Sequence, residues 1–108
     1  MNIGQITKMA QQMQTQMAQA QEELRETTVD VTAGGGAVRI VITGAQEVRS
    51  IEIDPSAVDP DEVEMLQDMV LSAVNEAIGR SKDLEKERMG QIAGGMGLPG
   101  MPGLPGFG

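Results

Sequence analysis

Residues 27–54 read TTVDVTAGGGAVRIVITGAQEVRSIEID, and this stretch carries the clearest β-pattern of the chain. Apolar and polar residues alternate with a period of two, as in strands that bury one face. The alternation falls into three runs, at about residues 27–33, 37–43 and 47–54. Because only short turns separate the runs, they predict a three-stranded antiparallel meander.

The alternation places a set of aliphatic side chains on one common face of this sheet. The set comprises Val29, Val31, Ala33, Val38, Ile40, Ile42, Ile51 and Ile53. The first turn, Gly34-Gly35-Gly36, has the glycine content of a phosphate-binding loop. A P-loop, however, continues with Lys and Ser or Thr into a helix, whereas here a strand follows. A hairpin turn is therefore favoured by roughly ten to one.

A second helix is expected on the C-terminal side of the sheet, at about residues 60–92. Asp59-Pro60-Asp61-Glu62 has the order of an N-cap, a first-turn proline and an N3 acid. The apolar stripe that follows should cover the sheet, and Gly79 is a point at which the helix can bend or break. The acids here could also gather a divalent metal, but capping explains them better because the spacing of a calcium-binding loop is missing.

An N-terminal helix is expected at about residues 3–26. Its apolar residues are spaced alternately by three and four, which is a heptad ladder that we call the α-helical seam. The seam consists of Ile3, Ile6, Ala10, Met13, Met17, Ala20 and Leu24. Two interpretations stay open at about even odds: a seam for a partner helix, or an ordinary amphipathic helix lying on its own sheet.

These elements form one α+β domain, residues 1–92, followed by a low-complexity tail. Residues 93–108 read AGGMGLPGMPGLPGFG and are expected to be disordered. The aliphatic core is thin, and the sheet has two open edges. Association with a second copy would bury more apolar surface and cover the open edges, so we expect an obligate homodimer.

Composition excludes several classes of protein. The 108 residues include no Cys, His, Trp or Tyr and one Phe, and the net charge is −8. A zinc finger, a thiol nucleophile and a Ser-His triad are thereby excluded, as is an aromatic platform for bases. We expect no enzyme, no metal, no cofactor and no small-molecule substrate. No apolar run is long enough to cross a membrane, and no signal-peptide pattern is found, so we expect a cytoplasmic protein.

Several motifs occur together in an order that is informative. A Met/Gln-rich N-terminal helix precedes the Gly-Gly-Gly-x-Val hairpin, Ile51-Glu52-Ile53-Asp54-Pro55, Ala73-Val74-Asn75-Glu76-Ala77 and a Gly-Gly-Met-Gly-Leu-Pro-Gly tail. In this order the chain resembles the YbaB/EbfC family of bacterial nucleoid-associated proteins. The resemblance implies a tweezer-like homodimer that binds duplex DNA in the nucleoid, with roles in chromosome organisation and gene regulation.

The resemblance also directs attention to the projecting helices as arms. On these arms the candidate DNA-binding residues are Lys8, Arg25, Arg80, Lys82, Lys86 and Arg88. The candidate dimer or partner seam comprises Ile6, Ala10, Met13, Met17, Ala20 and Leu24. Because the arms are not strongly basic, an alternative stays open: an acidic dimeric adaptor whose arms bind a protein partner in DNA metabolism.

Overall fold

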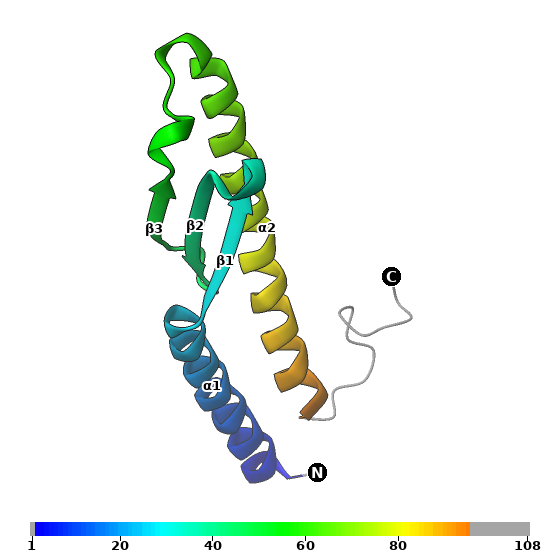
Figure 1. Cartoon of the computed structure of the whole chain (residues 1–108). Coiled ribbons are helices and arrows are strands. Elements are labelled where there is room, and N and C mark those ends of the chain that lie inside the picture. Colours follow the sequence, from blue (N-terminus) through cyan, green and yellow to red (C-terminus); the bar gives the residue numbers. More distant parts are fainter. Residues whose placement is uncertain (1, 96–108) are drawn as a thin grey trace.

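The computed structural model describes residues 2–95 as an elongated α+β molecule (Figure 1). Its principal extents are 70 × 28 × 15 Å and its radius of gyration is 19.4 Å. A compact chain of this length would have a radius of gyration of about 13 Å. The molecule is therefore a rod-like unit with a sheet in its middle and helices that extend from it. The expected disordered tail lies, beyond Gly95, outside the described residues.

The three predicted strands form one antiparallel sheet in the order β1-β2-β3. Their bounds are Thr28–Ala33 for β1, Val38–Thr43 for β2 and Val48–Ile53 for β3, within one residue of the sequence expectation. The glycine triplet forms a tight 3-10 turn in which all three residues have positive φ, between 62° and 97°. Only glycine adopts three such conformations in succession without strain, which confirms the hairpin interpretation of this motif.

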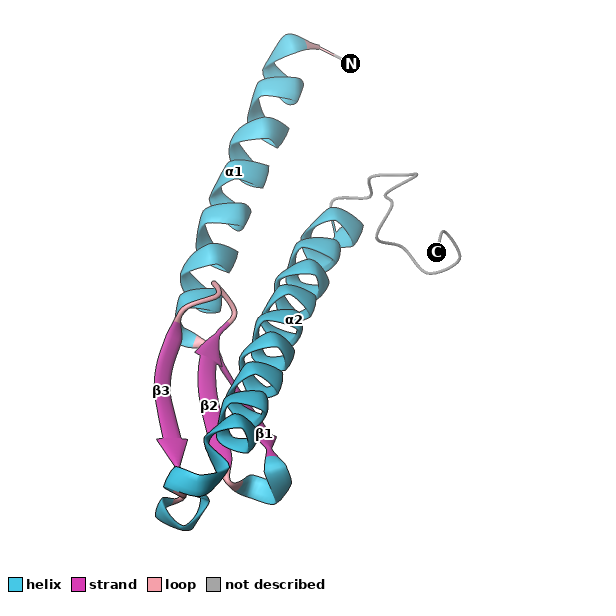
Figure 2. Cartoon of the chain, turned by 90° about the horizontal axis from the view of Figure 1, so that it is seen from above, coloured by secondary structure: helices cyan, strands magenta, loops and turns pink. Residues whose placement is uncertain are grey.

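The long helix α2, Val63–Gly95, packs across β1 and β2 but leaves β3 uncovered (Figure 2). The buried cluster consists of Val31, Val38, Ile40, Ile42, Ala73 and Ala77. Ile51 pairs with Ile40, and Ile53 pairs with Val38, so both share the inner face. Their expected burial is nevertheless wrong, because Ile51 is 49% and Ile53 39% exposed. A helix about 10 Å wide spans two strands about 4.8 Å apart, not three.

The start of α2 follows the predicted capping pattern. The Asp59 carboxylate accepts a hydrogen bond from the Asp61 backbone N–H at 2.9 Å, and Pro60–Glu62 form a 3-10 turn before α2 begins at Val63. The helix then runs without a break through Gly79 and ends at Gly95, three residues beyond the expected end. The break considered at Gly79 is thus absent, and nothing crowds that glycine.

The helix α1, Ile3–Glu26, projects from the sheet instead of lying on it (Figure 1). Its C-terminal end meets the β2–β3 turn at Gly44, whose backbone N–H donates to the Leu24 and Thr27 carbonyls at 2.9 and 3.0 Å. From α2, the buried Ser81 hydroxyl donates to the Thr43 carbonyl at 2.5 Å and accepts from the Gln46 backbone N–H at 3.0 Å. These bonds fix both helices to one turn of the sheet. No helix among residues 2–95 is long and apolar enough to cross a membrane.

Candidate nucleic-acid interface

Two helical arms extend together from one end of the sheet. They are α1 and the part of α2 that follows Gly79, and they run side by side in both views (Figures 1 and 2). A salt bridge from the Arg88 guanidinium to the Glu23 carboxylate joins the two helices. Arg88 also donates to the Gln91 side-chain oxygen at 3.2 Å. The six candidate DNA-binding residues all lie on these arms.

Three of the six candidate cations are already paired with an acid. Arg88 pairs with Glu23, and Arg80 approaches Glu76 one turn earlier in α2, at 3.6 Å. Arg25 pairs with Glu22, and this hydrogen bond and charge raise the pKa of Arg25 further above its usual value. Such pairs reduce the net positive charge that these side chains offer to a phosphate.

The other three candidates are lysines without such a partner. Lys8, Lys82 and Lys86 are exposed and make no ion pair with any residue in the described part of the chain. Lys82 and Lys86 are four residues apart, so they share one face of α2. The sequence did not separate these lysines from the paired arginines; for Arg88 it could not, because its partner Glu23 lies 65 positions away.

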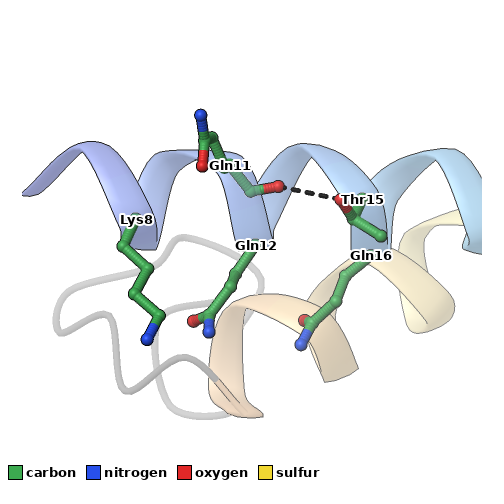
Figure 3. Close-up of a pocket in the computed structure, with 5 residues that line it drawn as sticks. All are labelled: Lys8, Gln11, Gln12, Thr15 and Gln16. Carbon is green, nitrogen blue, oxygen red and sulfur yellow. Dashed lines mark hydrogen bonds between the residues drawn. The ribbon is translucent and has the colours of Figure 1, made fainter. Parts of the chain in front are cut away.

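Around Lys8 the surface of α1 is polar and uncharged (Figure 3). A shallow groove here is lined by Lys8, Gln11, Gln12, Thr15 and Gln16. Lys8, Gln12 and Gln16 point to the same side of the helix, whereas Gln11 points away. The Thr15 hydroxyl donates to the Gln11 carbonyl at 3.0 Å, so it is occupied within the helix. Lysine and amide side chains are both donors to phosphate oxygens.

Seven of the sixteen acidic side chains lie at the opposite end of the molecule. Residues 52–68, which we call the acidic end, carry seven acids and no Lys or Arg. They run from the end of β3 into the start of α2, at the tip farthest from the arms (Figure 1). The rest of the chain carries nine acids against eight basic residues. The net charge of −8 is therefore concentrated where the candidate cations are not.

The acids of this end have structural partners. The Asp54 carboxylate accepts hydrogen bonds from the Ser56 backbone N–H and hydroxyl, both at 2.9 Å, and these bonds lower the pKa of Asp54. Together with the Asp59 cap, this supports capping as the role of the acids. On the outer face of the sheet, Arg39 pairs with Asp30 and Glu52, which raise its pKa and leave it unavailable to phosphate.

The α-helical seam divides into a covered and an uncovered part. Ala20 and Leu24 are buried where α1 meets α2 and the β2–β3 turn, and Met13 is half-buried. The other positions, Ile3, Ile6, Ala10 and Met17, are exposed. The interpretation of α1 as an amphipathic helix lying on its own sheet is thereby wrong. Its seam is open to a partner over most of its length.

A second apolar surface was missed in the sequence. Leu71 is 60% and Ile78 36% exposed on α2. Leu71 and Ile78 are seven residues apart and so lie on the same side of the helix, and Ser81, three residues after Ile78, bonds to the β2–β3 turn. We call this surface the β3–α2 face; it comprises Val48, Ile51, Ile53, Leu71 and Ile78. Leu71, an apolar residue outside the buried stripe, was the available signal.

Comparison with known proteins agrees with this arrangement. Residues 1–96 match the sequence profile of the YbaB/EbfC DNA-binding family. The chain belongs to the YbaB/EbfC DNA-binding family. It is 50% identical over 99 residues to a nucleoid-associated protein of Pelotomaculum thermopropionicum, covering 92% of this chain and 94% of the relative. It is 52% identical over 96 residues to one of Chloroflexus aurantiacus, covering 89% and 96%.

The same fold is found in a solved structure. A crystal structure of a Helicobacter pylori protein superposes with a TM-score of 0.76 at 23% identity, covering 85% of this chain and 97% of that one. The fold expectation is thus confirmed: a helix, a three-stranded antiparallel sheet and a long second helix. YbaB/EbfC proteins are non-enzymatic and nucleoid-associated, which confirms the family resemblance and the expectation that the chain is not an enzyme.

Proposed function

We propose that this chain is a cytoplasmic homodimer that binds duplex DNA directly through its arms, and so contributes to nucleoid organisation and gene regulation. The observation that carries the proposal is the separation of charge along the molecule. Three lysines that form no ion pair among residues 2–95 lie on the arms, whereas seven of the sixteen acids lie at the acidic end. Direct contact with phosphate would involve Lys8, Lys82 and Lys86 first, and the paired Arg25, Arg80 and Arg88 less.

The acidic end does not prevent this contact at physiological salt. The molecule is 70 Å long, and the Debye length at an ionic strength of 0.15 M is about 8 Å. Salt therefore screens the acidic end from DNA that is bound at the arms, and repulsion between the two is weak. DNA that approaches from the arm side meets the lysines and the amide groups of α1.

Binding of this kind contacts the backbone and reads little sequence. Specific readout needs side chains that reach base edges, or aromatic groups on which unpaired bases stack. The chain has a single aromatic residue, Phe107, and its unpaired cations are lysines, which bind phosphate as point charges. We expect similar affinity for unrelated duplexes.

The homodimer is supported by the β3–α2 face. Its five large aliphatic side chains lie in the open beside an unpaired sheet edge, and both are features that a stable soluble monomer avoids. A second copy would extend the thin core by placing its own face against this one around a two-fold axis. The axis would double the unpaired lysines from three to six.

The test is a salt series of duplex binding, measured by fluorescence anisotropy. With about four to six phosphates contacted per dimer, log affinity should fall with log salt at a slope of about −4 to −5. The double variant Lys82→Gln/Lys86→Gln should weaken binding to all duplexes alike and flatten the slope by about 2 to 4 units.

Arg80→Gln is the matched control for Lys82→Gln, because it removes the same charge from the same arm, where Glu76 already pairs with it. It should change affinity less than Lys82→Gln does. Equal effects of the two variants would contradict the role given to pairing. A wild-type protein that binds no duplex even at low salt would overturn the proposal and favour the acidic adaptor.

A further inference from the structure

The uncovered part of the α1 seam is a surface that the dimer proposed above does not use. Its exposed positions are Ile6, Ala10 and Met17 on the outer two-thirds of α1, with the half-buried Met13 between them, whereas the β3–α2 face lies beside the sheet. Ala20 and Leu24 of the seam are buried where α1 meets α2, and Met13 is partly covered. Ile6 and Ala10 stay exposed near the tip of the arm, and Met17 stays 39% exposed.

We propose that this segment pairs with the same segment of another dimer, as an antiparallel two-helix contact that joins dimers through their arm tips. The inference rests on the proposed dimer, but it uses a separate surface. The occupant is a second copy of this chain, and the argument is the self-complementarity of the segment in shape and charge.

The charge argument is the stronger one. A chain with a net charge of −8 repels its own copies, so a self-contact requires a segment without acids. Residues 2–21 contain no Asp or Glu and one basic residue, Lys8, which lies on the side of α1 away from Ala10. The positions that flank the seam in a heptad, where charges normally select the partner, are Thr7, Met9, Gln14 and Gln16. None of these four residues is charged, so none repels an identical helix.

The shape argument follows from the residues of the seam. In an antiparallel pair with the two-fold axis between residues 11 and 12, Ile6 faces Met17 of the second copy. Ala10 then faces Met13 of the second copy. A small side chain beside a large one lets the layers interdigitate, and methionine adapts to the remaining space. The axis repeats both layers, which makes four in all.

The overall shape selects the antiparallel direction. Two packed helices lie 8–10 Å apart, but the second and third extents of the molecule are 28 and 15 Å. A parallel pair would force two sheet ends into the same space. An antiparallel pair places the sheets at opposite ends of the contact and leaves Lys8 free for phosphate on its outer side. Two DNA-bound dimers could then be joined.

The test is the molar mass of the full chain, measured by light scattering over a range of concentrations. The wild type should shift from dimer toward tetramer between about 10 µM and 1 mM, since a contact this small belongs to the weak class. Ala10→Glu introduces two carboxylates at the two-fold contact and should weaken tetramer formation at least about tenfold. Gln12→Glu adds the same charge on the opposite side of α1 and should form tetramers at the same concentrations as the wild type.

Ile51→Asp separates this inference from the dimer proposal. In that variant the β3–α2 face is disrupted, so the chain should associate only to a two-chain species, and the double variant Ala10→Glu/Ile51→Asp should be monomeric. A wild type that stays dimeric at every concentration overturns the inference. Tetramers of Ala10→Glu that match those of the wild type overturn it equally. A wild-type tetramer with an Ile51→Asp variant that is also tetrameric would overturn the dimer face alone.

Discussion

Gly44 lies where α1, the β2–β3 turn and α2 meet, and its lack of a side chain allows this close approach. A methyl group there would lie 2.6 Å from Leu24 Cδ2, 3.1 Å from Leu84 Cδ2 and 3.2 Å from the Leu24 carbonyl oxygen. Two of these neighbours are ends of leucine side chains, but the third is backbone. The position of α1 relative to the sheet thus depends on one missing methyl group.

We predict that Gly44→Ala lowers the free energy of unfolding by about 1–3 kcal/mol, the usual cost of overpacking. Gly79→Ala is the matched control in the exposed middle of α2, where the added methyl meets nothing within 4 Å apart from its own stretch of helix. It should raise the free energy of unfolding by up to about 1 kcal/mol, because alanine favours a helix over glycine. Urea unfolding at one fixed protein concentration measures both variants, and effects of the same sign would contradict the assignment of Gly44 as a contact point.

The state of individual cations could be predicted from the sequence only in part. The arms and their six cations were identified by position, and the arginine pairs with Glu22 and Glu76 follow from helical spacing. The pair between Arg88 and Glu23 does not, because it depends on how two helices approach across the molecule. Charge counts along the chain cannot separate a paired arginine from a free lysine when the partner is distant in sequence.

The extent of helix α2 explains both the success and the failure of the fold prediction. Period-two alternation identified all three strands, and the broad apolar stripe identified the helix that covers them. The alternation gives the face of the sheet on which each side chain lies, but not the number of strands that the helix covers. Ile51 and Ile53 point to the predicted face and stay exposed, because α2 spans the two strands β1 and β2.

The two arms are joined mainly by apolar contacts, with Arg88 and Glu23 as a charged link. Their side chains are 35% and 57% exposed, so solvent screens the pair and its contribution should not exceed about 1 kcal/mol. We predict that Glu23→Gln has a small effect on global unfolding but increases amide exchange in α1 near Ala20. Glu76→Gln, which breaks a pair within α2, is the control and should leave α1 unchanged. Hydrogen exchange measured by mass spectrometry distinguishes the two results, and equal exchange in both variants would show that the pair does not hold the arms together.

The molecule as a whole separates its charges along a length that exceeds the screening length several-fold. This property follows from two facts that the sequence contains only separately: the order of the acids and the direction in which each element runs. The sequence places residues 52–68 between a strand and a helix, but only the fold shows that this segment is the tip opposite the arms. A protein with a sequence pI of about 4.3 can thereby present a surface that DNA approaches.

This separation predicts a specific dependence of DNA affinity on salt. In the variant Asp61→Asn/Glu62→Gln/Glu64→Gln, three charges of the acidic end are removed while both capping residues, Asp54 and Asp59, are kept. At an ionic strength of 0.15 M, where the Debye length is about 8 Å, the affinity for duplex DNA should change less than about twofold. At 0.01 M, where the Debye length is about 30 Å, the acidic end of the wild type repels DNA at the arms in part, and the variant should bind more tightly than the wild type.

Glu87→Gln, the control, removes one acid next to Lys86 on the arm. It should increase affinity at both salt concentrations, by more than the triple variant does at 0.15 M. Anisotropy titrations of the three proteins decide the matter: a triple variant that gains more affinity at 0.15 M than Glu87→Gln would mean that DNA contacts the acidic end, not the arms.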